Sequence, residues 1–113
     1  MRNARPGTRQ CFATAVTAAL MLFGATAVAA DTVRIKVDDL AFDPAEVSVR
    51  VGDTIEWINK DFVDHTATEQ RGQWDVALPS DASRRLLAPK AGTFAYFCRF
   101  HPHMKGVIHV GIP

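Results

Sequence analysis

The sequence predicts an all-β fold of the sandwich or barrel type. Short runs of residues alternate between apolar and polar side chains, as half-buried strands do. Glycine, aspartate and asparagine separate these runs at nearly regular spacing, which is typical of sandwiches and barrels. No segment of useful length has the apolar spacing of an amphipathic helix.

Six segments are the expected strands. Val33, Ile35 and Val37 share one face of the first segment, and the third segment places Ile55 and Trp57 on one face. Residues 70–80 are irregular, and a short strand or one helical turn would both fit them. The expected strands are residues 32–37, 46–51, 54–59, 83–88, 93–98 and 106–110. The aromatic candidates for the core are Phe42, Trp57, Trp74, Phe94, Tyr96, Phe97 and Phe100, of which Phe100 could instead flank a metal site.

Residues 1–30 have the three parts of a secretory signal peptide. Three arginines come first, an apolar run rich in small residues follows, and the segment ends in an Ala-x-Ala pattern. We expect cleavage after Ala29 or Ala30, which leaves residues 31–113 as a single periplasmic domain. The alternative is an N-terminal membrane anchor, but the alanine and threonine content makes it a weak span. The arginines are Arg2, Arg5 and Arg9.

Cleavage changes both the charge and the cysteine count. Of the 13 basic residues three would be lost, so ten would face 12 acidic residues, a formal net charge of −2. This charge argues against a nucleic-acid binder, which would show a basic face. Cys11 would leave with the peptide, so Cys98 would be the one cysteine of an exported domain. Metal ligation explains such a lone thiol.

A cluster of metal-binding residue types lies near the end of the chain. The loop from Cys98 to Met104 contains a thiolate, the imidazoles of His101 and His103, and a thioether. His65 lies upstream, in an expected loop after the 54–59 strand. Two histidines, one cysteine and a weak axial methionine form the ligand set of blue-copper electron-transfer sites. The sequence therefore predicts one copper ion bound by His65, Cys98, His101 and Met104.

Two other interpretations of this loop explain less. A structural zinc site would use four firm donors and would not need a thioether. A buried, unligated Cys98 would behave as a small apolar residue. That second interpretation leaves the nearby histidines and methionine unexplained.

The residues from Val33 to Val110 resemble the cupredoxins of the plastocyanin, amicyanin and pseudoazurin group. The resemblance is carried by Phe42-Asp43-Pro44, the segment from Val47 to Asn59, Asp64-His65-Thr66, and the short Cys98–Met104 loop, which is most similar to that of amicyanin. It implies a Greek-key β-sandwich with copper near one end. His65, Cys98 and His101 would be equatorial ligands, with Met104 as the long axial one.

The same resemblance implies how electrons would enter and leave. His101 would be the ligand nearest to solvent, within an apolar docking face that includes Phe62, Pro102 and Phe100. The partners would be redox proteins such as a c-type cytochrome or a dehydrogenase, met by a monomeric carrier. No nucleic acid and no stable membrane anchor are expected.

Four residues near the site need separate comment. Asp64 and Thr66 stand where related proteins often have proline and asparagine. We expect the Thr66 hydroxyl to hydrogen-bond toward the Cys98 loop, and the Asp64 charge to favour Cu(II) and lower the reduction potential. His103 should point to solvent, and His109 should be a strand residue rather than a ligand.

The expected function is that of an exported type 1 blue-copper protein, which shuttles one electron between Cu(II) and Cu(I) and is not an enzyme. The main alternative is a periplasmic copper chaperone or copper buffer. Against it, the mature chain has no methionine-rich or histidine-rich stretch. A copper enzyme would need a second copper site, for which the histidines are too few, and a metal-free interaction domain would leave the Cys98 loop unexplained.

Overall fold

The computed structural model describes residues 3–4, 7, 13–22, 24 and 29–113. Arg2, Arg5, Arg9 and Cys11, together with Ala27 and Val28 of the expected cleavage region, lie outside the described residues. The signal peptide therefore stays a prediction. Within the described part of the chain, no helix is long and apolar enough to cross a membrane.

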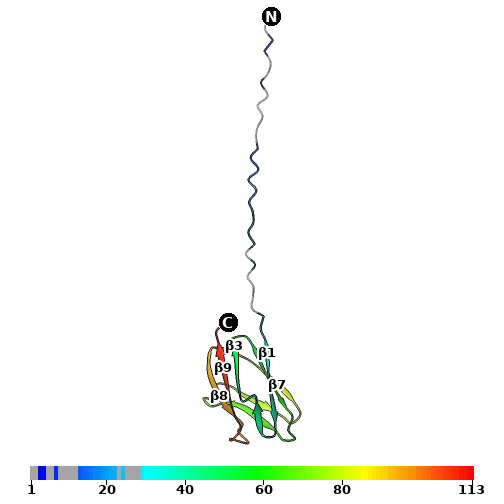
Figure 1. Ribbon diagram of the computed structural model, residues 1–113, viewed down its shortest axis with the longest axis vertical. Coiled ribbons are helices and arrows are strands. Elements are labelled where there is room, and N and C mark those ends of the chain that lie inside the picture. Colours follow the sequence, from blue (N-terminus) through cyan, green and yellow to red (C-terminus); the bar gives the residue numbers. More distant parts are fainter. Residues whose placement is uncertain (1–2, 5–6, 8–12, 23, 25–28) are drawn as a thin grey trace.

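Nine strands in the described residues form two sheets (Figure 1). One sheet has the order β2-β1-β4-β7 and the other the order β3-β9-β8-β5-β6. The strands are β1 (Thr32–Asp38), β2 (Ala41–Asp43), β3 (Glu46–Arg50), β4 (Thr54–Asn59), β5 (His65–Glu69), β6 (Asp75–Leu78), β7 (Ser83–Leu87), β8 (Gly92–Phe97) and β9 (Lys105–Gly111).

The chain crosses repeatedly between the two sheets. β1 pairs with β4 and β3 pairs with β9, both in parallel, whereas the other pairs are antiparallel. A parallel pair needs a crossover, and here each crossover passes through the opposite sheet. The predicted all-β fold is confirmed as a sandwich with Greek-key connections.

The core lies between the sheets, and it is filled by the apolar residues of the strands whose alternation was predicted. Ile35, Val37, Ile55 and Trp57 are each at most 1% exposed. Of the expected core aromatics, Phe42, Trp57, Phe94 and Tyr96 are buried, Trp74 packs against them, Phe97 is partly buried and Phe100 is exposed.

β2 and β5 were not among the strands predicted from the sequence, and β6 lies in residues 70–80, where a short strand was one of two options. β2 and β6 are short, and β5 has the sequence His-Thr-Ala-Thr-Glu, in which apolar and polar residues do not alternate. All five residues of β5 are nevertheless buried. Hydrogen bonds satisfy its polar side chains instead, and no buried side-chain nitrogen or oxygen among the described residues is left without a partner.

Tyr96 links the aromatic core to the end of the sandwich where β8 leads into the Cys98 loop. Its ring packs 4.7 Å from Phe42 and 5.7 Å from Trp57, between ring centroids, and its hydroxyl accepts a hydrogen bond from Trp57 Nε1 at 3.3 Å. Burial raises the pKa of Tyr96 to about 12, so the phenol stays neutral. Its partner across the β8–β9 ladder is Gly106, where an added Cβ would clash with the Tyr96 ring.

Candidate metal centre

Three potential ligand atoms converge at one end of the sandwich. His65 Nδ1 lies 3.1 Å from His101 Nδ1, and Cys98 Sγ lies 3.8 Å and 3.7 Å from these two atoms. Within the described part of the chain, this is the one place where potential ligand atoms of three histidine, cysteine, aspartate or glutamate residues lie together. Cys98 and His65 are buried, and His101 is partly exposed. Such a set presents one soft and two borderline donors to a single point.

His65 is the first residue of β5, not a loop residue as the sequence analysis predicted. It pairs with Leu78 of β6 and is 1% exposed. The absence of apolar alternation in β5 concealed this strand. Because the ladder fixes the backbone at His65, the direction of its imidazole is set by the sheet rather than by a flexible loop.

Asp61 holds the other side of the His65 ring, and the sequence analysis did not identify it. Its Oδ2 lies 2.7 Å from His65 Nε2. Burial would raise the pKa of Asp61, but hydrogen bonds from His65, Leu40 and Asp39 outweigh it and lower that pKa below its usual value. An ionised carboxylate only accepts hydrogen bonds, so His65 Nε2 is the donor in this contact, which selects the neutral tautomer whose lone pair is on Nδ1. No sequence pattern marked this contact, because a four-residue spacing brings side chains together on a helix and Asp61 lies in the non-helical segment before β5.

Cys98 directly follows β8 and is fully buried. Its sulfur accepts a hydrogen bond from the Thr66 backbone N–H at 3.3 Å. The loop that it begins is closed by two backbone hydrogen bonds, from Cys98 N to Met104 O and from Met104 N to His101 O. These contacts orient the sulfur and leave its open side toward the two imidazoles.

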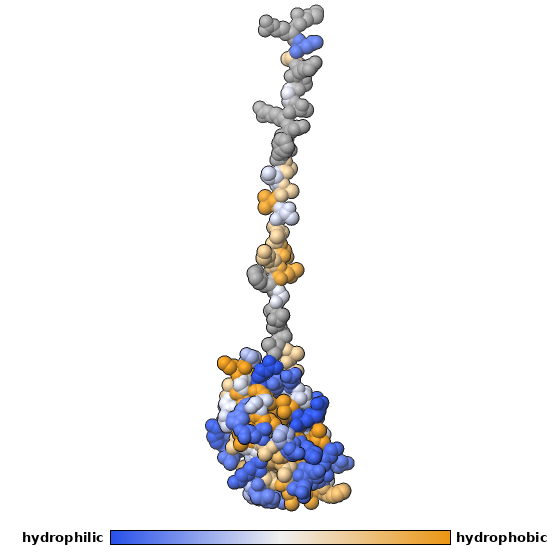
Figure 2. Space-filling model, in the orientation of Figure 1, coloured by the Kyte–Doolittle hydropathy of each residue, from blue (hydrophilic) through white to orange (hydrophobic). Residues whose placement is uncertain are grey.

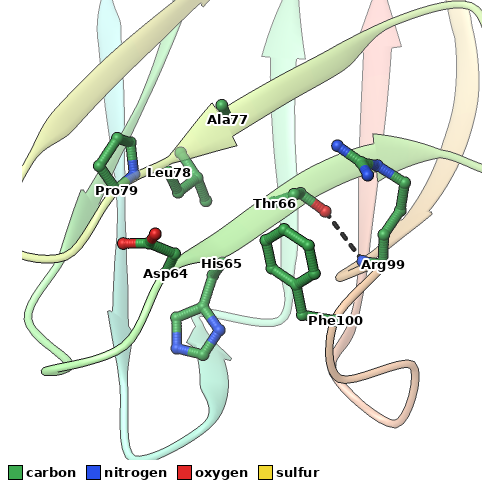
Figure 3. A pocket seen from close by; sticks show the side chains of 8 residues that line it. All are labelled: Asp64, His65, Thr66, Ala77, Leu78, Pro79, Arg99 and Phe100. Carbon is green, nitrogen blue, oxygen red and sulfur yellow. Dashed lines mark hydrogen bonds between the residues drawn. The ribbon is translucent and has the colours of Figure 1, made fainter.

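The Thr66 hydroxyl hydrogen-bonds to the Cys98 loop, as expected. Its Oγ1 accepts the Arg99 backbone N–H at 2.9 Å (Figure 3). Thr68 Oγ1 donates to Asp75 Oδ1, so the Thr66 hydroxyl donates in turn to Thr68 Oγ1 at 2.9 Å. The Arg99 side chain also pairs with Asp75, at 3.3 Å. A continuous chain of hydrogen bonds thus joins the loop to β5 and β6.

The remaining predicted residues take different positions. Met104 is buried at the end of the loop. His103 is exposed, in agreement with the expectation that it points to solvent. His109 lies in β9, where its ring contacts Glu46 and Thr93 rather than the cluster. The Asp64 carboxylate is exposed and accepts the Ser80 backbone N–H at 2.8 Å.

The surface around this end carries exposed apolar side chains. Phe62 is fully exposed, and Phe100, Val63 and Leu40 are exposed over 57%, 46% and 41% of their area. Elsewhere the visible face of the domain mixes hydrophilic and hydrophobic residues (Figure 2). A pocket of about 140 Å³ lies between His65, the β6 end and Phe100 (Figure 3).

The donor chemistry of this cluster fits copper. A cysteine thiolate and two imidazoles suit copper in either of its common oxidation states. The cluster sits between a packed core and a hydrogen-bonded loop, so its donors are held in place before any metal arrives.

Comparisons with known proteins agree with this chemistry. Residues 11–110 match the model of the cupredoxin-like domain family. The chain is 31% identical over 94 residues to the amicyanin of Paracoccus denitrificans, covering 78% of this chain and 72% of that protein. It is 30% identical over 104 residues to the amicyanin-alpha of Methylorubrum extorquens, covering 87% of each.

Solved structures give the same result. A reduced amicyanin variant superimposes with a TM-score of 0.62 at 27% identity, covering 71% of this chain and 82% of that one. The copper-containing nitrite reductase of Thermus scotoductus superimposes with a TM-score of 0.68 at 28% identity, covering 80% of this chain. The chain spans about a quarter of the length of that enzyme, 24%. One copper ion is the cofactor of this fold, and the chain belongs to the cupredoxin-like family.

Proposed function

We propose that the protein is an exported type 1 blue-copper carrier of single electrons, with His65, Cys98, His101 and Met104 as its metal ligands. The observation that carries this proposal is the convergence of two imidazole Nδ1 atoms on one buried cysteine sulfur, at the distances of 3.1, 3.7 and 3.8 Å given above. Copper would supply a one-electron couple between Cu(II) and Cu(I) at this point.

The residues around the cluster suit a carrier because they resist rearrangement. His65 is held by the β5–β6 ladder and by Asp61, and Cys98 is held by Thr66 and by the closed loop. Firmly placed donors change little between the two oxidation states, which favours rapid electron exchange. The buried sulfur is also kept away from solvent oxidants.

The route to a partner would pass through His101, the partly exposed member of the cluster. Phe62, Phe100 and Pro102 are exposed, and we expect them to contribute to an apolar docking face for a redox protein, such as a c-type cytochrome or a dehydrogenase. The signal-peptide pattern supports a periplasmic location. No enzymatic activity is carried over from the nitrite reductase, because the chain spans so little of that enzyme.

The alternative is a periplasmic copper chaperone or buffer, for which the exposed His103 beside His101 would offer a transfer ligand. Their ring centroids are 6.3 Å apart. Repeated voltammetric cycles of the copper-loaded protein, followed by metal analysis, separate the two functions. A carrier keeps its copper and gives a reversible one-electron wave. Loss of copper on each oxidation or reduction would instead establish the chaperone.

A further inference from the structure

A carboxylate lies behind His65, at the ring nitrogen that does not face the other two ligand residues. Asp61 lies in the segment between β4 and β5, and its Oδ2 is 2.7 Å from His65 Nε2. The His65 side chain is 0% exposed and that of Asp61 is 13% exposed. The contact is therefore largely shielded from water, where hydrogen bonds to an ionised group are strong.

Three N–H groups converge on this one carboxylate. Asp61 Oδ1 accepts the Asp39 backbone N–H at 2.8 Å, and Oδ2 accepts the Leu40 backbone N–H at 3.1 Å in addition to His65. Asp39 and Leu40 form the two-residue turn between β1 and β2, both with positive φ, 51° and 57°. Turns of this kind direct their N–H groups to one side, and here that side is Asp61.

The backbone of Asp61 is held as firmly as its side chain. Its N–H donates to Asn59 Oδ1 at 2.9 Å, and its carbonyl accepts the Ser80 hydroxyl at 2.7 Å. Asn59 is 1% exposed and donates in turn to the Val63 and Leu78 carbonyls. These hydrogen bonds oppose any movement of the carboxylate toward solvent or away from the imidazole.

We propose that Asp61 is the positioning residue of this copper site: it fixes His65 in the tautomer that presents Nδ1 to the metal, and its charge biases the site toward Cu(II). The inference rests on the proposed function. A carboxylate behind a ligating imidazole raises the basicity of that ligand. The oxidised site carries one more positive charge than the reduced site, so a neighbouring anion stabilises it more.

Asp64 provides a matched control, since it is a second aspartate in the same segment and adjacent to His65 in sequence. Its carboxylate is exposed and bonds to the Ser80 N–H, not to the imidazole. Figure 3 shows the Asp64 carboxylate and the His65 ring pointing in different directions. The effect of its charge on copper is therefore screened by water.

The test compares Asp61→Asn and Asp64→Asn in the copper-loaded full protein. An amide has one accepting oxygen, so the substituted side chain cannot serve all three N–H donors. We expect Asp61→Asn to weaken Cu(II) binding relative to Cu(I) by at least about tenfold, which raises the one-electron potential by at least about 59 mV. Asp64→Asn should raise it by clearly less. Equal shifts in the two variants, or an unchanged potential in Asp61→Asn, would overturn the proposal.

A second measurement needs no variant and no copper. Long-range proton–nitrogen NMR of the metal-free wild-type protein reports which ring nitrogen of His65 carries hydrogen. We expect the proton on Nε2, whereas a proton on Nδ1 would contradict the positioning role even if Asp61→Asn failed to fold. If wild-type protein formed no reversible copper couple, the proposed function would fail, while the tautomer would still test the Asp61 contact.

Discussion

Thr66 connects the strand that begins with His65 to the loop that begins with Cys98, and its hydroxyl can be removed almost without changing its shape. In Thr66→Val the valine keeps the branched side chain of a strand residue and the backbone N–H that bonds to Cys98 Sγ. It loses the acceptor for the Arg99 N–H and the donor for Thr68 Oγ1. The substitution thus breaks the hydrogen-bond chain at its centre.

The expected cost follows from those two contacts. A typical buried hydrogen bond contributes about 1 kcal/mol net, so the two together contribute about 2 kcal/mol. The Arg99 N–H is only partly buried, so the free-energy penalty for leaving it unpaired should be near the lower end of the usual range of about 1–3 kcal/mol. For a domain of this size, a loss of about 2 kcal/mol lowers Tm by roughly 10 °C.

Urea unfolding of the metal-free protein, followed by tryptophan fluorescence, measures this loss directly. Thr93→Val is the matched control, because the same change there removes a hydroxyl that contacts only His109 on the exposed face of β8. It should stay within about 0.5 kcal/mol of wild type, as exposed substitutions usually do. The reasoning would be refuted if Thr66→Val were as stable as Thr93→Val.

Two further predictions concern the packing and the acid stability of the fold. Gly106→Ala places a Cβ against the ring of Tyr96, which is buried and cannot move away, so we expect a loss of about 1–3 kcal/mol in thermal unfolding. Gly111→Ala, whose Cβ would meet nothing nearer than Val49 O at 3.8 Å, should be close to neutral, and equal losses would contradict the packing argument. Burial would raise the pKa of Glu69, but hydrogen bonds from Gln73 and Arg71 lower it below the ordinary value of 4.5. The stability that Glu69 contributes is therefore present above about pH 4.5 and lost as the pH falls through the lowered folded pKa. Glu69→Gln should be less stable than wild type at pH 7, and urea midpoints should converge as the pH is lowered; a constant difference down to about pH 3 would disprove the linkage.

The strands with regular alternation were predictable because every second residue is apolar and faces the core. Val33, Ile35 and Val37 of β1, and Ile55 and Trp57 of β4, follow this pattern. β5 was not predictable in the same way. It is buried on both faces, and its polar side chains are satisfied by partners such as Asp61 and Asp75, which apolar alternation does not identify.

The residues of the metal cluster were partly predictable from their types. Cysteine and histidine are rare enough in this chain that Cys98, His101 and His65 stand out in the sequence, and the structure brings them together. Met104 was identified with them and is buried at the end of the loop, and its role as a ligand stays a prediction. Asp61 was missed because an aspartate in a turn is ordinary. Only the fold shows that its carboxylate faces His65 rather than solvent.

The central claim is a thiolate-ligated, redox-active copper, and the visible absorption spectrum of the protein with one equivalent of Cu(II) tests it most directly. We expect an intense blue band that bleaches with a mild reductant, returns on reoxidation, and is absent from Cys98→Ser. A colourless wild-type product, or a band that survives in Cys98→Ser, would contradict the account.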